Sequence, residues 1–203
     1  MLTVVVEGES DRGPTAKVLA ACGLTVDRWL PPRDGKSKLD ERLPAYVRAS
    51  RTPGDSWIVF RDTDGECPVL LRRKLLGDDT AGVSLLLRLA HPEVEAWLLG
   101  DTGGIATWLD ISPTHVPLAP EALREPKEEL LRLALRSRKR DLRTAVVRQD
   151  GRTGPRYSAM LNEFALDHWD PAIARCQCPS LDRAMNALTE WQNGRRSPRP
   201  RHW

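Results

Sequence analysis

The sequence turns abruptly from apolar to acidic over Trp57-Ile58-Val59-Phe60-Arg61-Asp62-Thr63-Asp64-Gly65. The aromatic and β-branched residues at its start are typical of a buried strand, and the acids and glycine that follow indicate a loop. Open α/β sheets bind ligands beyond the carboxyl ends of their strands. Because strand residues alternate between faces, we expect Asp62 and Asp64 on one side and Thr63 on the other. Two close carboxylates repel each other unless a cation or proton lies between them, which suggests a metal site. Taken alone, the Asp-Thr-Asp-Gly run is equally well explained as a simple polar turn.

Acidic residues also follow the first apolar run of the chain. Residues 2–6 predict a central strand, and this strand ends in Glu7-Gly8-Glu9-Ser10-Asp11. Asp11 is expected in or beside the first turn of a helix over 11–22, where the helix dipole favours an acid. Glu7 and Asp11 can therefore point into one crevice. Taken alone, Asp11 is better explained as a helix cap and Glu7 as a solvated turn residue.

A third acidic strand end follows the apolar run 83–89, in the segment His91-Pro92-Glu93-Val94-Glu95. Pro92 suits the first turn of a helix, and Glu93 then lies near the positive end of the helix dipole. Glu93 and Glu95 are two residues apart and cannot share a helix face. Only one of them points into the crevice if a helix begins here, whereas both can do so if the backbone stays extended.

The remaining elements complete an α/β fold with a mainly parallel sheet flanked by helices. Periodicity predicts a further strand over 24–30 and helices over 39–49 and 68–76. The second part of the chain is helical and more basic, with helices predicted over 128–143, 157–166 and 181–191. We expect three parts, which are an α/β domain over 1–110, a helical extension packed on it over 111–193, and a mobile basic tail over 194–203.

The predicted helix over 128–143 carries basic residues at three- and four-residue spacing beside its leucine face. This stripe predicts either a phosphate-facing surface or an ordinary solvated face. Its members are Arg132, Arg136, Lys139 or Arg140, and Arg143.

Composition excludes several classes of protein. The chain has 203 residues, a net charge of +3, 40% hydrophobic and 29% charged residues, which is ordinary for a globular protein. Its four cysteines are irregularly spaced, so a structural zinc site is not expected. The segment Gly35-Lys36-Ser37 lacks the upstream glycine of an ATP-binding P-loop. The first residues lack the basic and apolar regions typical of a signal peptide, and no apolar run reaches membrane-spanning length, so we expect a cytoplasmic protein.

The order of the acidic strand ends resembles the Toprim domain of topoisomerases, primases and OLD-family nucleases. The chain is similar to a bacterial group of small stand-alone Toprim-like proteins of uncharacterised function, which share the Val6-Glu7-Gly8 start and the Glu-x-Glu-Ala-Trp-Leu-Leu segment at 93–99. The match covers residues 2 to about 101 and is weaker near Tyr157 and Cys178-Pro179-Ser180.

The resemblance implies a metal-dependent nuclease that uses two Mg²⁺ or Mn²⁺ ions. It makes Glu7, Asp62 and Asp64 metal ligands and catalytic residues, and Asp11 the additional acid of OLD-type nucleases. Glu93 or Glu95 then completes a second metal site, and Lys127 is the downstream catalytic lysine. The implied partners are nucleic acid, with DNA favoured over RNA, and an ATPase, in a system that defends against phage.

Two other functions fit parts of the pattern. A Toprim-like scaffold without turnover can serve as a binding or regulatory subunit of a larger ATPase complex. The Asp62-Thr63-Asp64-Gly65 loop also resembles the nucleophile loop of haloacid-dehalogenase-type phosphatases. Their Asp pair normally follows the first strand, whereas here a whole strand-helix-strand unit precedes it, so the phosphatase is disfavoured. The massed acids favour metal binding over an inert scaffold, because unpaired negative charge costs stability.

Overall fold

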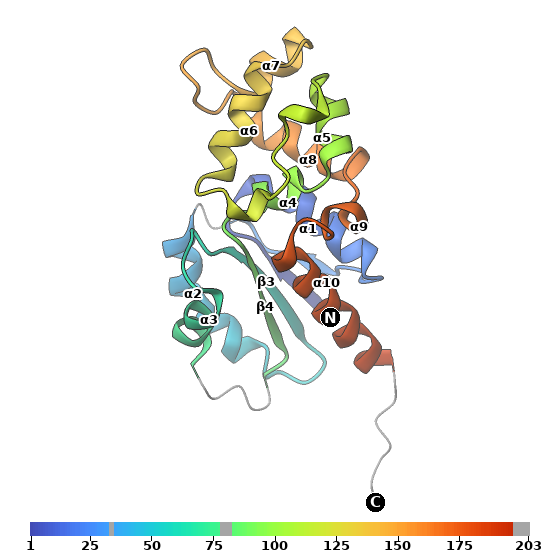
Figure 1. Cartoon of the computed structure of the whole chain (residues 1–203). Helices are drawn as coiled ribbons and strands as arrows, with labels where there is room; N and C mark the ends of the chain where they lie inside the picture. The colour runs from blue at the N-terminus through green and yellow to red at the C-terminus, as the bar shows by residue number, and fades with distance from the viewer. Residues whose placement is uncertain (33–34, 78–82, 197–203) are drawn as a thin grey trace, which may run out of the picture.

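The computed structural model describes residues 1–32, 35–77 and 83–196. Within this part of the chain, four parallel strands form one sheet in the order β2-β1-β3-β4 (Figure 1). The predicted α/β class with a helical C-terminal region is confirmed. The strands are β1 (Leu2–Val5), β2 (Arg28–Trp29), β3 (Ser56–Asp62) and β4 (Leu85–Ala90).

The register of the sheet brings the acidic strand ends to one edge. Leu2 to Val5 pair with Ser56 to Val59, and Trp57 to Asp62 pair with Leu85 to Ala90. The carboxyl ends of β1, β3 and β4 are therefore neighbours, because all three strands run in the same direction. The chain segments that follow them share this edge.

Helices cover both faces of the sheet. Val5, Trp57 and Val59 pack in one hydrophobic cluster with α2 (Lys36–Ala49). Their neighbours Val4, Ile58 and Phe60 belong to a second cluster on the opposite face. Strands that are buried on both faces have continuous apolar sequences, which is why β1 and β3 could be predicted from the sequence. Figure 1 shows α2 and α3 (Pro68–Leu76) on one side of the sheet and α1 (Arg12–Ala21) and α10 (Pro179–Arg196) on the other.

The second cluster continues from the sheet into the C-terminal helices, where it includes Leu130, Phe164 and Leu188. None of the helices in the described ranges combines the length and apolar character needed to cross a membrane. The other helices are α4 (Val94–Leu99), α5 (Thr102–Leu109), α6 (Pro126–Leu135), α7 (Arg140–Val146), α8 (Tyr157–Asp167) and α9 (Pro171–Ala174), with 3-10 turns η1 (Glu9–Asp11), η2 (Pro113–His115) and η3 (Pro120–Ala122).

The predicted strand over 24–30 is much shorter in the structure, where β2 has two residues. The segment before it is held in a different way. The backbone N–H of Leu24 donates to the Leu19 carbonyl at the end of α1. The carboxylate of Asp27 accepts a 2.6 Å hydrogen bond from the backbone N–H of Leu2. The segment therefore turns at the end of α1 and forms hydrogen bonds with β1 from Asp27 onward, where the Asp27 side chain accepts from the Leu2 N–H.

The prediction of one continuous helix over 128–143 is wrong, because residues 136–139 are not helical and separate α6 from α7. The buried Ser137 lies in the break, where its hydroxyl accepts a hydrogen bond from the Lys139 backbone N–H. The side chain of Arg143 donates to the Ser137 carbonyl. The ammonium of Lys139 donates to two carbonyl oxygens of α5, and Arg132 pairs with Glu129. The basic residues therefore do not form one continuous phosphate-facing stripe.

The C-terminal end also differs from the prediction. Helix α10 continues to Arg196, so the first residues of the predicted mobile tail are helical. The remainder of that tail, residues 197–203, lies outside the described ranges.

Candidate functional site

A pocket of about 250 Å³ lies where the carboxyl ends of β1, β3 and β4 meet. All of the residues that the sequence predicts as metal ligands or catalytic groups line it. The lining residues are Glu7, Gly8, Ser10, Asp11, Gly35, Asp62, Asp64, Glu93, Glu95 and Lys127.

Asp62, at the end of β3, forms hydrogen bonds with the segments that follow β1 and β4. It is the last residue of β3, and its backbone N–H donates to Oε2 of Glu7, which follows β1, over 3.4 Å. Its own Oδ1 accepts a 3.0 Å hydrogen bond from the backbone N–H of Val94, the first residue of α4. Glu7 and Asp62 are thus in contact, although 55 residues separate them in the sequence.

Asp11 is held by the tight turn that follows β1. Its Oδ2 accepts a 2.7 Å hydrogen bond from the backbone N–H of Gly8, and its Oδ1 accepts one from the Ser10 hydroxyl. The turn is fixed from the C-terminal region, since the Asn162 side chain binds the Gly13 N–H and the Glu9 carbonyl. A Cβ at residue 13 would lie 2.6 Å from the Cα of Asn162, so this close approach requires glycine.

Glu93 and Glu95 both line the pocket because the helix begins between them. Glu93 precedes α4 in an extended conformation, with φ −144° and ψ 160°, and its Oε2 accepts a 3.0 Å hydrogen bond from the Lys127 backbone N–H. Glu95 lies in the first helical turn and is buried. Its Oε1 accepts a 2.8 Å hydrogen bond from the hydroxyl of Tyr157. Pro92 lies before the helix, not in its first turn as predicted.

Asp64 has a different environment from the other acids. Its backbone has φ 49°, in the left-handed region, and it is followed by Gly65 at φ 81°. Its carboxylate pairs with the ammonium of Lys36 at 3.0 Å and with the guanidinium of Arg61 at 3.2 Å. Arg61 is 3% exposed and also pairs with Asp40 on α2 at 3.0 Å. Two cations of the protein therefore already partly neutralise Asp64.

Sequence reasoning missed Arg61 and Tyr157 as parts of the site. A signal for Arg61 was available, because a charged residue inside an apolar strand needs an ionic partner when it is buried. No comparable local pattern pointed to Tyr157 as part of the site. The Lys127 ammonium lies 5.1 Å from the centre of the Tyr157 ring, so the tyrosine contacts both the predicted lysine and Glu95.

Burial and mutual repulsion raise the pKa of several carboxyl groups in the pocket. Burial and the neighbouring Glu95 charge raise the pKa of Asp11 to about 7. Burial, followed by the charge of Asp11, also raises the pKa of Asp62 well above its ordinary value. The pKa of Glu7 and that of Glu93 are raised in the same direction, chiefly by burial. A bound cation would relieve this repulsion and favour the ionised carboxylates.

The donor set suits a hard divalent cation, since Mg²⁺ and Mn²⁺ prefer carboxylate oxygens. Among residues 1–32, 35–77 and 83–196, no three His, Cys, Asp or Glu side chains are already arranged around one ion position. One oxygen of each of five pocket carboxylates binds a protein donor, and the second accepts no hydrogen bond from the described residues. These second oxygens are Oε1 of Glu7, Oδ2 of Asp62, Oδ1 of Asp64, Oε1 of Glu93 and Oε2 of Glu95.

Comparisons of the chain with protein-family models, with curated proteins and with solved structures found no match. The functional interpretation therefore depends on the residues of the pocket.

Proposed function

We propose that the acidic pocket binds divalent metal ions, Mg²⁺ or Mn²⁺, and that the protein is a metal-dependent nuclease. The observation that carries this proposal is the convergence of six carboxylates and one lysine from distant parts of the sequence on one pocket. Such a concentration of acid is unfavourable in a buried site without a compensating cation. A structural role alone gives no reason for so many like charges in one place.

Glu7, Asp62 and Asp64 would hold the metal, with Glu93 or Glu95 completing a second site. When bound, a pair of such ions supplies water activation and stabilisation of the leaving oxygen in phosphodiester cleavage. The Asp11 carboxylate accepts one hydrogen bond on each oxygen, from Gly8 and from Ser10, so its orientation is fixed beside the other acids. Each oxygen keeps a second lone pair with which it could contact a cation.

Lys127 would bind the phosphate that is cleaved. Its ammonium lies against the face of Tyr157 and lines the acidic pocket. A lysine is a compact cation that contacts phosphate oxygens as a point charge. The backbone N–H of Lys127 also positions the Glu93 carboxylate. Lys127 would thus orient a metal ligand with its backbone and bind the substrate phosphate with its side chain.

The resemblance to OLD-type Toprim nucleases extends this proposal to the substrate and the setting. We infer a nucleic-acid substrate, DNA in preference to RNA, an ATPase partner, and a cytoplasmic role in defence against phage. These inferences rest on the motifs around Glu7, Asp62 and Glu93, and on the pocket that the same residues line.

A second function is favoured by the environment of Asp64. Lys36 and Arg61 already pair with this carboxylate, as they would in a site that no longer binds metal. A Toprim-like subunit without turnover, acting as the binding or regulatory part of an ATPase complex, would have this arrangement. The two functions differ in whether the pocket binds a divalent cation.

Cleavage assays separate these alternatives. Supercoiled plasmid, single-stranded DNA and RNA are incubated with the protein in Mg²⁺, Mn²⁺ or EDTA. The variant Asp62→Asn keeps an oxygen that can accept the Val94 hydrogen bond, and Asp167→Asn, at the exposed end of α8, is the matched control. The nuclease predicts metal-dependent cleavage by the wild type and the control but not by Asp62→Asn. Cleavage in EDTA, or by Asp62→Asn at the wild-type rate, would exclude it.

A further inference from the structure

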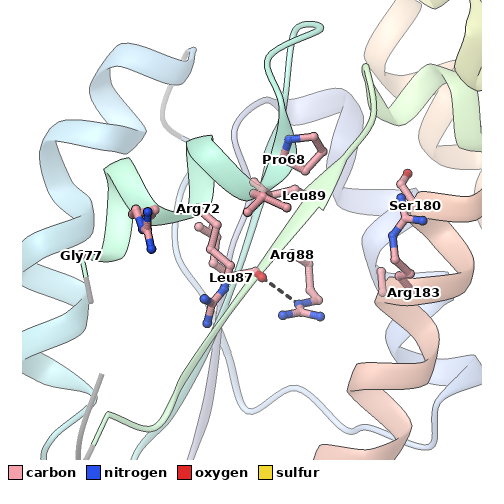
Figure 2. Close-up of a pocket in the computed structure, with 11 residues that line it drawn as sticks. Pro68, Arg72, Gly77, Leu87, Arg88, Leu89, Ser180 and Arg183 are labelled. Carbon is pink, nitrogen blue, oxygen red and sulfur yellow. Dashed lines mark hydrogen bonds between the residues drawn. The ribbon is translucent and has the colours of Figure 1, made fainter. Parts of the chain in front are cut away.

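A second pocket, of about 530 Å³, lies along the free edge of β4, between α3 and α10. Figure 2 shows Arg88 of β4 in its centre, with Arg183 projecting from α10. No described residue lines both this pocket and the acidic pocket, which lies beyond the end of the same strand. The arginine pocket is defined by Arg72 of α3, Arg88 of β4 and Arg183 of α10.

Among the described residues, the lining of the arginine pocket carries positive charge only. No Asp or Glu lines it within the described ranges. None of its three defining arginines forms an ion pair with another described residue. Arg88 is half-buried, and burial together with the positive charge of Arg72 lowers its pKa. A half-buried guanidinium facing like charge is unfavourable unless an anion binds there.

Another basic pocket on the surface is balanced by acids. The pocket beside α6 contains Arg124, Lys127, Arg132 and Arg152, but it is also lined by Glu125, Glu128, Glu129 and Asp150. At the α10 end of the arginine pocket, Glu121 binds the backbone N–H and hydroxyl of Ser180. The N–H of Ser180 is therefore already engaged, and anion binding depends on the guanidinium groups.

The free edge of β4 also limits what can bind. The backbone N–H groups of Trp57 and Thr63 donate to the carbonyls of Ser84 and Ala90, so the carbonyls of the even-numbered residues of β4 point toward β3. The carbonyl of Leu87 faces the other way, and the Arg88 side chain already donates to it at 2.8 Å (Figure 2). An added peptide strand would have to displace this contact. A ligand recognised through the guanidinium groups would not.

We propose that the arginine pocket binds a phosphate group of a nucleotide, either free or within an oligonucleotide, with Arg88 between Arg72 and Arg183. Guanidinium groups bind phosphate oxygens in a planar, bidentate manner, and several of them match the multiple oxygens of one phosphate. The pocket volume is within the range of sites for small ligands. This binding does not depend on the metal chemistry of the acidic pocket.

Binding is measured in EDTA by calorimetric titration with inorganic phosphate and with a mononucleotide, and by fluorescence anisotropy with a short labelled oligonucleotide. We expect Arg88→Ala, Arg72→Ala and Arg183→Ala each to weaken binding of the tightest probe by about tenfold or more. Arg136→Ala and Arg138→Ala, which remove exposed arginines elsewhere, should stay within about twofold. The variant Asp62→Asn should bind like the wild type, so failure of the nuclease proposal would leave this result unchanged.

Thermal unfolding of Arg88→Ala separates binding from structure. The variant should still unfold cooperatively without ligand, because the lost hydrogen bond to the Leu87 carbonyl is offset by removal of a half-buried charge beside Arg72. Equal affinities for Arg88→Ala and the wild type would overturn the proposal, as would binding of an acidic peptide but of no phosphate probe.

Asp78 and Asp79 follow Gly77 in the sequence and lie outside the described ranges. Phosphate binding that appears only in Asp78→Asn/Asp79→Asn would likewise overturn it.

Discussion

The hydroxyl of Tyr157 donates a 2.8 Å hydrogen bond to Oε1 of Glu95, and both residues are buried. Tyr157 is the first residue of α8, whereas Glu95 lies in the first turn of α4 beside the sheet. Helix α8 therefore supports the acidic pocket indirectly, by holding the lining residue Glu95. Removing this contact affects the site even though Tyr157 is far from the strand ends in sequence.

Substituting Tyr157→Phe should destabilise the protein. The change keeps the ring that packs under Lys127 but leaves the buried Glu95 carboxylate without its donor. An unsatisfied buried polar group costs about 1–3 kcal/mol of unfolding free energy. Urea unfolding at neutral pH in EDTA measures this loss, and equal unfolding free energies for variant and wild type would contradict the role of the hydroxyl.

The metal-free protein should lose stability as the pH rises. The pKa of Asp11 is raised from 3.8 to about 7 in the folded state, so the unfolded chain releases this proton first. The contribution of Asp11 is present below its unfolded pKa and disappears as the pH passes through its folded pKa. The raised pKa of Asp62 acts in the same direction. Urea midpoints in EDTA from about pH 5 to pH 8 should therefore decrease.

The variant Asp11→Asn is the control for this pH dependence. It removes the titrating group and leaves a side-chain oxygen that can accept the Gly8 hydrogen bond. Its urea midpoint should vary less with pH than that of the wild type. A wild-type midpoint that rises over the same interval would show that the pocket carboxylates are not destabilised by their burial.

Substituting Lys36→Ala should strengthen divalent-cation binding. Lys36 competes with a metal ion for Asp64, and both side chains of this pair are partly exposed, at 48% and 31%. Exposed ion pairs are weak, so we expect a gain in Mn²⁺ affinity of roughly two- to fivefold. Arg42→Ala, which removes an exposed cation from the same helix, is the control. Weaker Mn²⁺ binding by Lys36→Ala would contradict the competition.

Substituting Lys127→Met should reduce cleavage without removing metal binding. The backbone N–H that holds Glu93 remains in the variant, whereas the ammonium that faces the substrate is lost. Loss of one such charged contact to a reacting phosphate lowers the cleavage rate by about 10²- to 10³-fold. Single-turnover cleavage and Mn²⁺ titration measure the two effects separately. Lys139→Met, which affects contacts with α5, should cleave at the wild-type rate.

The sequence was sufficient to place the acids together because their positions depend on strand ends. Glu7, Asp62 and Glu93 each follow an apolar run, and parallel pairing brings such ends to one edge. The helix boundary at Val94 was not predictable, so the sequence left the roles of Glu93 and Glu95 open. The extended conformation of Glu93 places both of them on the pocket.

Contacts that depend on tertiary packing could not be read from the sequence. The pairs Arg61–Asp40 and Tyr157–Glu95 join residues from separate helices and strands, and no local pattern links them. The break after α6 had a similar cause. Hydrogen bonds to Ser137 from Lys139 and Arg143 fix it, whereas the spacing of leucines and arginines continued through it.

Calorimetric titration of the metal-free protein with MnCl₂ tests the acidic pocket most directly. The wild type should bind Mn²⁺ saturably, and Asp62→Asn should bind at least about tenfold more weakly, because a neutral amide replaces a carboxylate ligand. Asp167→Asn should match the wild type. Absence of Mn²⁺ binding by the wild type, or equal binding by Asp62→Asn, would contradict a divalent-metal site formed by these acids.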